Sequence, residues 1–334
     1  MTAPNRVPLS VLDLATVREG YGSPDALRGT IEIAKTADEL GYARFWVAEH
    51  HNMPAVASTA PPVLIGAVAA NTHRIRVGSG GVMLPNHMPF VVAEQFALLE
   101  ALYPDRIDLG IGRAPGTDQA TAAALRGVSP YLTVEQFPEH LQTLLGLLGK
   151  EQTTRLRATP APETFPEVWM LGSSTYGAQV AAALGLPFCY AYHFAMSSDV
   201  DGALRLYRDG FRPSPRYSRP HVMVSASAIA AETTEEAQFL AGPSRVMALS
   251  LRTGRLGPMV SPESAARADL SDLDRAMLQS LPGTQYAGTA DEVVAGLDAL
   301  VERTGADELI LAGAVYDPAT RQESLARIAK AWGL

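Results

Sequence analysis

Cysteine is almost absent from this sequence: Cys189 is the only one among 334 residues. A single cysteine excludes an intramolecular disulfide and a cysteine-based metal cluster. Residues 1–8 lack the apolar stretch of a signal peptide, and no apolar run approaches the ~20 residues of a membrane helix. We therefore expect Cys189 to be a small core residue in a cytoplasmic protein.

Basic residues are also scarce. The 27 lysines and arginines are outnumbered by 35 acidic residues, which gives a formal net charge of -8 and a pI near 5.4. This balance gives no sign of a nucleic-acid partner. The hydrophobic fraction of 47% is sufficient for a large core. The length allows one barrel or two smaller domains, and we expect a single domain over residues 1–334.

Short apolar segments alternate with helical segments along most of the chain, which implies a parallel sheet. One helix has Ser23 as its N-cap, Pro24 in its first turn and Gly41 as its stop. The predicted fold class is α/β, a (β/α)8 TIM barrel with a long insertion between strands 7 and 8. The strands are expected at residues 7–14, 44–48, 74–77, 105–111, 168–171, 188–192, 221–229 and 307–311. Further helices are expected at residues 61–71, 89–101, 134–149, 198–210 and 318–332, and from the turn at residues 172–175 to residue 184.

The insertion between strands 7 and 8 spans about eighty residues, far more than an ordinary loop. Gly254, Gly257, Pro258 and Pro262 mark a mobile middle within it. We interpret residues 241–285 as a lid over the barrel mouth.

Polar and flexible residues follow the second and third strands. Glu49, His50 and His51 end the second strand, and neighbouring side chains on a strand alternate in direction, so the two histidines cannot both point into the barrel. Histidine suits proton transfer near neutral pH, although a pair of hydrogen-bonded structural histidines is an equally good interpretation. Gly80 and Gly81 would let a flat ligand approach the backbone. Taken alone, this glycine run is better explained as an ordinary turn.

Two other strand ends together favour a phosphate site. Arg113 follows Gly110 and Gly112 at the end of the fourth strand, where a guanidinium can hold a phosphate through two hydrogen bonds. Ser173 and Ser174 precede a helix whose backbone N–H groups suit an anion. A rim salt bridge and a plain helix cap are the simpler alternatives for these two features.

In combination, these segments resemble the bacterial luciferase-like flavin-dependent monooxygenase family, and most closely its single-chain luciferase family oxidoreductase branch. The resemblance rests on residues 46–51, 77–85 and 106–113 in gap-free spacing, and on residues 182–187. It is weakest between Ala241 and Leu281. It implies a barrel that binds FMN at its C-terminal face, with His50 as the catalytic base. The cofactor-binding residues that it implies are Ser79, Gly80 and Gly81 at a non-proline cis peptide beside the flavin ring, and Arg113, Ser173, Ser174, Tyr176 and Gly177 around the phosphate.

The implied activity is the oxygenation of a small organic substrate by reduced FMN and O2 through a C4a-(hydro)peroxyflavin. No NAD(P)H domain is visible, so we expect a separate NAD(P)H:flavin reductase as a partner. A homodimer is also expected, because the second and third helices carry many apolar residues and few charges. Gly112 stands where luciferase has a reactive cysteine, and Ser173 replaces an acidic residue. These departures put light emission and long-chain aldehyde specificity in doubt.

Three alternatives stay open at this point. A deazaflavin-dependent hydride-transfer enzyme would share the fold, and a non-catalytic flavoprotein would share the cofactor, although His50 argues against the latter. A metal hydrolase would use Glu49, His50 and His193. It lacks the His-x-His strand end and the converging carboxylates that such a site needs, and we expect no metal. The sequence does not identify the substrate.

Overall fold

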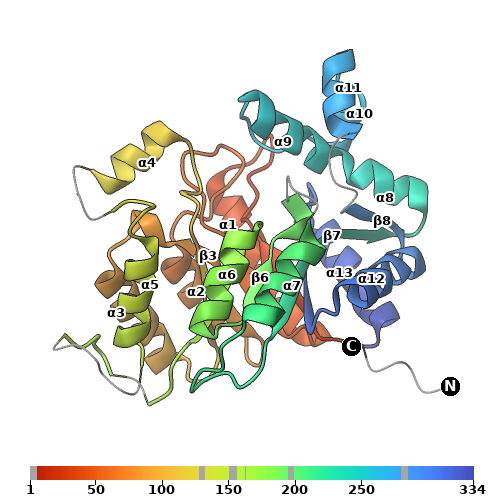
Figure 1. Ribbon diagram of the computed structural model, residues 1–334. Coiled ribbons are helices and arrows are strands. Elements are labelled where there is room, and N and C mark those ends of the chain that lie inside the picture. Colours follow the sequence, from red (N-terminus) through yellow and green to blue (C-terminus); the bar gives the residue numbers. More distant parts are fainter. Residues whose placement is uncertain (1–5, 128–131, 150–155, 162, 195–198, 280–284) are drawn as a thin grey trace.

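Eight parallel strands close into a ring in the structure, a computed structural model that describes residues 6–127, 132–149, 156–161, 163–194, 199–279 and 285–334 (Figure 1). This arrangement confirms the predicted (β/α)8 barrel. In ring order the strands are β1 (Leu9–Asp13), β2 (Arg44–Val47), β3 (Arg76–Met83), β4 (Ile107–Gly112), β5 (Glu167–Gly172), β6 (Phe188–Tyr190), β7 (Val222–Ala231) and β9 (Glu308–Ala312), which pairs with β1. A further strand, β8 (Gln285–Thr289), pairs with β7 outside the ring.

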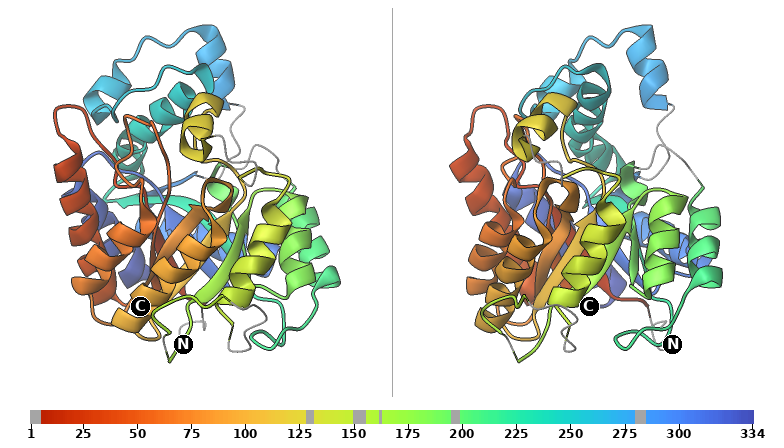
Figure 2. Two further views of the ribbon diagram at one scale, coloured as in Figure 1. Left: turned by 90° about the vertical axis from the view of Figure 1, so that its left-hand side faces the viewer. Right: turned by 60° about the vertical axis from the view of Figure 1, so that its left-hand side comes forward.

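Helices surround the barrel on all sides (Figure 2). The outer layer consists of α1 (Ser23–Leu40), α2 (Pro61–Ala70), α3 (Pro89–Leu102), α5 (Phe137–Leu147), α6 (Thr175–Leu184), α7 (Val200–Gly210), α12 (Ala290–Thr304) and α13 (Pro318–Trp332). The predicted end of α1 is confirmed, since Gly41 ends it in the left-handed conformation with φ 87°, and a proline lies in its first turn. The predicted N-cap is wrong: Gly22 holds that position and Ser23 is the first helical residue. None of the described helices is long and apolar enough to cross a membrane.

A second group of helices lies beyond the carboxyl ends of the strands. Figure 1 shows α4 (Gln119–Arg126), α9 (Gly242–Thr253), α10 (Pro262–Ala266) and α11 (Asp272–Gln279) above this end of the barrel, with α8 (Thr234–Leu240) beside β8. The insertion between the seventh and eighth barrel strands thus consists largely of helices. It also contains α12, which belongs to the outer layer and which the sequence reading missed.

The third strand differs from its prediction. We expected it to end at Val77 and to be followed by a flexible glycine run, but β3 continues to Met83 with a change of register between Ser79 and Val82. A side chain added at Gly80 would come within 2.7 Å of Leu12 inside the barrel. The missing side chains therefore allow the strand to bulge against its neighbours and remain in the sheet.

Apolar side chains fill the barrel interior in the region of Trp46 and Trp169, whose rings meet edge to face at 5.5 Å. Cys189 belongs to this cluster and is 3% exposed, as expected for a small core residue. Between the sheet and the helices, a larger cluster of buried aliphatic and aromatic residues forms the main core. The interior is therefore a packed support for the strand ends, not a pore.

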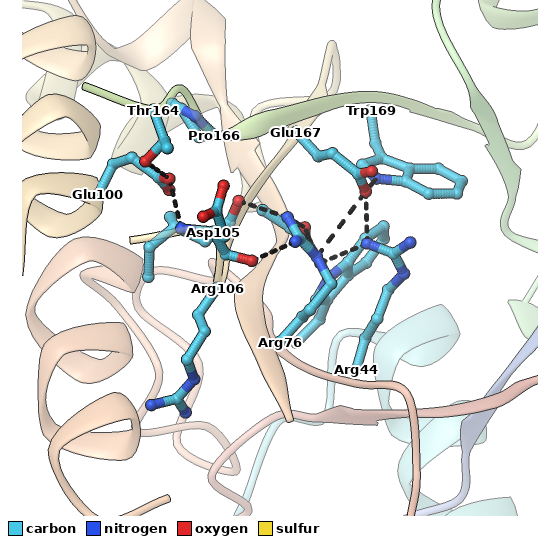
Figure 3. A network of polar contacts seen from close by, with 12 residues as sticks. Arg44, Arg76, Glu100, Asp105, Arg106, Thr164, Pro166, Glu167 and Trp169 are labelled. Atoms are coloured by element: carbon cyan, nitrogen blue, oxygen red, sulfur yellow. Dashed lines mark hydrogen bonds and ion pairs between the residues drawn. The ribbon is translucent and has the colours of Figure 1, made fainter. Parts of the chain in front are cut away.

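Charged residues occupy the opposite, amino-terminal end of the barrel (Figure 3). Arg44 lies 2.9 Å from Asp108, 2.6 Å from Glu167 and 3.1 Å from Glu308, and Arg76 also contacts Asp108. Asp108 and Glu308 are almost completely buried, so removing one partner would leave an uncompensated buried charge. We assign this cluster to stability because it lies at the end of the barrel that does not bear active sites in this fold.

Candidate active site

A buried carboxylate organises the end of β2. Glu49 has no exposed surface and accepts three hydrogen bonds: from His51 Nε2 at 3.0 Å, from His87 Nε2 at 2.8 Å and from the Met83 amide at 3.1 Å. Burial by itself raises the pKa of Glu49, but the hydrogen bonds from the two histidines and the amide outweigh it, so the pKa lies below its usual value. Glu49 is therefore an ionised carboxylate.

His50 is oriented differently from His51. Its Nδ1 lies 3.1 Å from the carbonyl oxygen of Gly116, which follows β4. A carbonyl oxygen can only accept, so Nδ1 carries the hydrogen. Burial lowers the pKa of His50 below its usual value, which favours the neutral ring. The geometry thus assigns His50 an unprotonated Nε2, the form that a general base requires.

His193 approaches His50 from the other side of the barrel. It follows β6, and its Nδ1 lies 2.6 Å from Ser225 Oγ on the buried face of β7. Burial and, to a smaller extent, the charge of His50 together lower the pKa of His193 to about 4. The two histidines are therefore close enough to interact electrostatically, and both are neutral near pH 7.

The glycine run of β3 contains the expected cis peptide. The non-proline cis bond joins Gly80 to Gly81. The Ser79 hydroxyl is buried and donates to the Gly110 carbonyl at 2.9 Å, so its hydrogen is engaged within the sheet. A side chain at Gly81 would lie 2.6 Å from the same carbonyl oxygen. Ser79 and Gly81 thus hold β3 against β4, and their contact with a cofactor stays a prediction.

The ends of β4 and β5 bring Arg113 and Tyr176 together. The Arg113 guanidinium carbon lies 4.0 Å from the centroid of the Tyr176 ring. Within the described part of the chain, no hydrogen bond or ion pair occupies this guanidinium. A stacked cation whose N–H groups have no protein partner is well suited to an anionic ligand.

The start of α6 supplies further donors beside this cation. Ser174 holds the N-cap position, but its side chain caps no backbone N–H group. Where Ser, Thr or Asp precedes another described helix as its N-cap, the side chain does accept such a bond; these residues are Asp118, Asp199, Thr233, Ser261, Thr289 and Asp317. The first N–H groups of α6, including those of Tyr176 and Gly177, therefore remain available to a ligand. A phosphate fits this set of donors.

The structure brings the predicted residues together in two groups. His50 and the β3 bulge belong to adjacent strands, β2 and β3, while Arg113, Ser173, Ser174, Tyr176 and Gly177 surround the ends of β4 and β5. The sequence reading missed the part played by His87, because no local pattern links it to Glu49. It also missed Gly116 as the partner of His50. The Pro115–Gly116 pair is a turn signal that can be recognised in the sequence, and Gly116 does adopt a positive φ of 67°.

Metal binding finds no support at this mouth. Across the described residues, no group of three His, Cys, Asp or Glu side chains is arranged to hold a metal ion. A surface hollow of about 420 Å³ is lined by residues of the outer helices α7 and α12, among them Arg205 and Arg303. It lies away from the strand ends and shares no residue with the candidate site.

Comparison with known sequences shows extensive similarity. A family model described as luciferase-like monooxygenase matches residues 7–308. A luciferase-like monooxygenase of Escherichia coli (strain K12) is 40% identical over 319 residues, which cover 95% of each chain. The N-acetyl-S-alkylcysteine monooxygenase of Bacillus subtilis (strain 168) is 40% identical over 237 residues, which cover 70% of each chain.

Solved structures share the fold over nearly the whole chain. The crystal structure of apo-MsnO8 has a TM-score of 0.92 at 36% identity and covers 98% of this chain and 99% of its own. Two more distant structures each have a TM-score of 0.69. One is the oxygenating constituent of a 3,6-diketocamphane monooxygenase from Pseudomonas putida in complex with FMN, at 19% identity and 97% coverage of both chains. The other is an F420-dependent secondary alcohol dehydrogenase with an F420–acetone adduct, at 17% identity and 98% and 99% coverage. At these identities the two distant structures indicate the fold alone.

Proposed function

The chain belongs to the luciferase-like monooxygenase family, and on that premise we propose that it uses reduced FMN and O2 to oxygenate a small organic substrate. The observation that carries the cofactor assignment is the donor set at the ends of β4 and β5. Arg113 has no protein counter-ion among the described residues, and the neighbouring helix α6 begins without a side-chain cap. The phosphate of FMN supplies the anion that this arrangement lacks.

Bound and reduced FMN would supply the O2-activating chemistry, and the chain's own residues position it. Arg113, Ser173, Ser174, Tyr176 and Gly177 would hold the phosphate. The Gly80–Gly81 peptide would contact the flavin ring. One of these contacts comes from within β3 and the other from the ends of β4 and β5, so both come from rigid elements of the barrel.

His50 is the proposed catalytic base. Its Nδ1–H is held by the Gly116 carbonyl, so its Nε2 can accept a proton from the substrate or from the reacting centre. Burial lowers its pKa, which keeps the base form populated at neutral pH. We therefore expect kcat/KM to fall on the acidic side with an apparent pKa below the ~6.5 of a free histidine.

The remaining proposals concern partners. We propose that a separate NAD(P)H:flavin reductase delivers the reduced FMN. We also propose a homodimer formed through α2 and α3. Four large apolar side chains of these helices are exposed: Val63 by 76%, Val91 by 50%, Leu98 by 50% and Leu102 by 60%.

Anaerobic titration of the purified protein with FMN, riboflavin and F420, followed by visible spectroscopy, tests the cofactor assignment. Tight FMN binding, much weaker riboflavin binding and no F420 binding are expected.

Reduced FMN and O2 should then oxidise a probe substrate, for which an N-acetyl-S-alkylcysteine is the first choice because one relative is named for acting on it. Preferential binding of F420 would contradict the proposal and favour hydride transfer. Loss of turnover in His50→Gln with intact FMN binding would exclude a non-catalytic flavoprotein.

A further inference from the structure

The Glu49 carboxylate receives more hydrogen-bond donors than a neutral side chain of the same shape could satisfy. Both imidazole Nε2 atoms, of His51 and His87, contact the single oxygen Oε1, and the Met83 amide contacts Oε2. An ionised carboxylate is acceptor-only, so all three partners must donate. His51 and His87 are thereby held as the tautomers that carry hydrogen on Nε2.

These three contacts join separate parts of the barrel mouth. Glu49 and His51 follow β2, Met83 ends β3 just beyond the Gly80–Gly81 bulge, and His87 follows the short 3-10 helix Leu84–Asn86. The carboxylate therefore ties the backbone after β2 to the backbone after β3. A contact of this kind sets the distance between the two strand ends.

The loop after β4 holds the same tripeptide from the other side. The Gly116 carbonyl accepts from the His50 ring at 3.1 Å and from the His51 amide at 3.4 Å, and Thr117 Oγ1 donates to the His51 carbonyl at 2.8 Å. A side chain at Gly116 would come within 2.7 Å of the Glu49 carbonyl oxygen. His50 is thus clamped between two sets of contacts, one that centres on Glu49 and one that centres on Gly116.

We propose that Glu49 is a positioning residue, whose carboxylate fixes the backbone on both sides of His50 and so aims His50 Nε2 relative to the Gly80–Gly81 bulge. This inference rests on the proposed function for the role of His50, and it adds a residue that acts through His51, His87 and the Met83 amide. A substitution at a residue that does not touch the substrate can still displace a catalytic group slightly, and such a displacement can lower the rate strongly. Glu49 contacts neither His50's ring nor the Gly80–Gly81 peptide directly in the described hydrogen-bond network.

Glu49→Gln is the sharpest test because it keeps the shape and changes the donor count. The amide offers one oxygen and one NH2 group in place of two acceptor oxygens. If the amide oxygen takes the place of Oε1, the NH2 group faces the Met83 N–H, which is also a donor. If the NH2 group takes that place, both histidines must accept at Nε2 and carry their hydrogen on Nδ1. Nitrogen-15 NMR should therefore show His51 and His87 both as Nε2–H tautomers in the wild type, and either both as Nδ1–H or a shifted Met83 amide in Glu49→Gln. The ring signals of His50 should shift as well, because its backbone is no longer held in place. The FMN Kd should rise about tenfold, and kcat should fall more than KM changes.

Glu100→Gln is the matched control. Glu100 is equally buried and also accepts from a backbone amide and a side-chain hydroxyl, those of Asp105 and Thr164, but it lies away from the barrel mouth. It should lower the melting temperature without altering the His50 signals or the FMN Kd. Glu49→Asp, which keeps the charge, should restore most of the function. His87→Leu, at a partly exposed position, removes one donor to Glu49. It should shift the His50 signals and raise the FMN Kd as Glu49→Gln does, but by smaller amounts. This variant keeps the proposal testable if Glu49→Gln does not fold.

Unchanged His50 signals and FMN Kd in both Glu49→Gln and His87→Leu would overturn the positioning role. Equal losses of FMN affinity in Glu100→Gln and Glu49→Gln would do so as well, because a general loss of stability would then explain both. If the wild type binds no FMN, the proposed function fails, yet the tautomers of His50, His51 and His87 still decide whether Glu49 controls their geometry.

Discussion

The Arg113 guanidinium stacks on the ring of Tyr176, with 4.0 Å between the guanidinium carbon and the ring centroid. The two residues come from successive strand ends, one after β4 and one at the start of α6. Stacking holds the planar cation while leaving its N–H edge for a ligand. The pair therefore gives the proposed phosphate clamp a preset orientation.

Arg113→Ala should weaken FMN binding by about tenfold to a hundredfold, which corresponds to the roughly 1.5–3 kcal/mol of a hydrogen bond to a charged group. Riboflavin has no phosphate, so its Kd should hardly change. Arg205→Ala removes an equal charge from the exposed face of α7 and serves as the control. Fluorescence titration of both flavins measures these affinities, and equal losses for FMN and riboflavin would reject the clamp.

The half-buried histidine His193 should make stability depend on pH. Its pKa is lowered to about 4 by burial, whereas an unfolded histidine titrates near 6.5. Between these values the unfolded chain binds a proton that the folded chain does not, so the free energy of unfolding rises as the pH rises from about 4 to about 6.5. The full difference amounts to roughly 3 kcal/mol.

Replacing His193 by Gln should remove that part of the pH dependence, because glutamine does not titrate and can still bond to Ser225. Denaturant unfolding of both proteins at several pH values across this window gives the two slopes. His73→Gln, at an exposed position, should leave the slope close to that of the wild type. A His193→Gln slope equal to the wild-type slope would show that His193 titrates normally in the folded protein.

Local signals predicted those parts of the fold that depend on local chemistry. The proline and glycine that bound α1 and the span of α13 from Pro318 to Trp332 follow the sequence reading closely. The helix α12 was also predictable, because Thr289 and Glu292 form a capping box that can be recognised in the sequence.

Tertiary contacts account for the parts that sequence reasoning could not reach. A glycine run is ordinarily read as a turn, and β3 continues through one because Leu12 and Trp46 fill the space that side chains would need. The partners of Glu49 lie as far as 38 residues away along the chain. Local periodicity carries no record of such a contact, so the sequence indicated His50 but not the clamp around it.

The exposed apolar face of α2 and α3 should form a homodimer interface. Leu98 is 50% exposed on α3, and a charge at the centre of a buried interface opposes association. Leu98→Glu should therefore shift sedimentation from dimer to monomer. Leu251→Glu is the control, since Leu251 is also 50% exposed but lies on α9. A wild-type protein that sediments as a monomer at micromolar concentration would exclude this interface.

The insertion over the mouth is anchored at Met259. This residue is 1% exposed, its amide donates to the Val17 carbonyl at 2.9 Å, and its carbonyl accepts from the Glu19 amide at 2.8 Å. Arg18, between these two partners, bonds to Asp317 at 2.8 Å. Among the described residues, these contacts tie the proposed lid of residues 241–285 to the loop after β1, and Ser244 ties its start to the Ala314 carbonyl. Motion should therefore concentrate away from these two places.

Hydrogen exchange should reveal this division within the lid. The Met259 and Glu19 amides should be protected in the free protein, since they are bonded beside a buried side chain, whereas α11, with Leu273 67% exposed, should exchange quickly. Addition of FMN and substrate should slow exchange in α11 if the segment closes over the site.

Deleting residues 253–262 removes the anchor but none of the proposed phosphate ligands, so FMN binding should persist. Water would then reach the site more freely, and hydrogen peroxide released per reduced flavin consumed should increase. Unchanged coupling of flavin oxidation to product in the deletion variant, or fast exchange at Met259 in the wild type, would show that this segment does not work as an anchored lid.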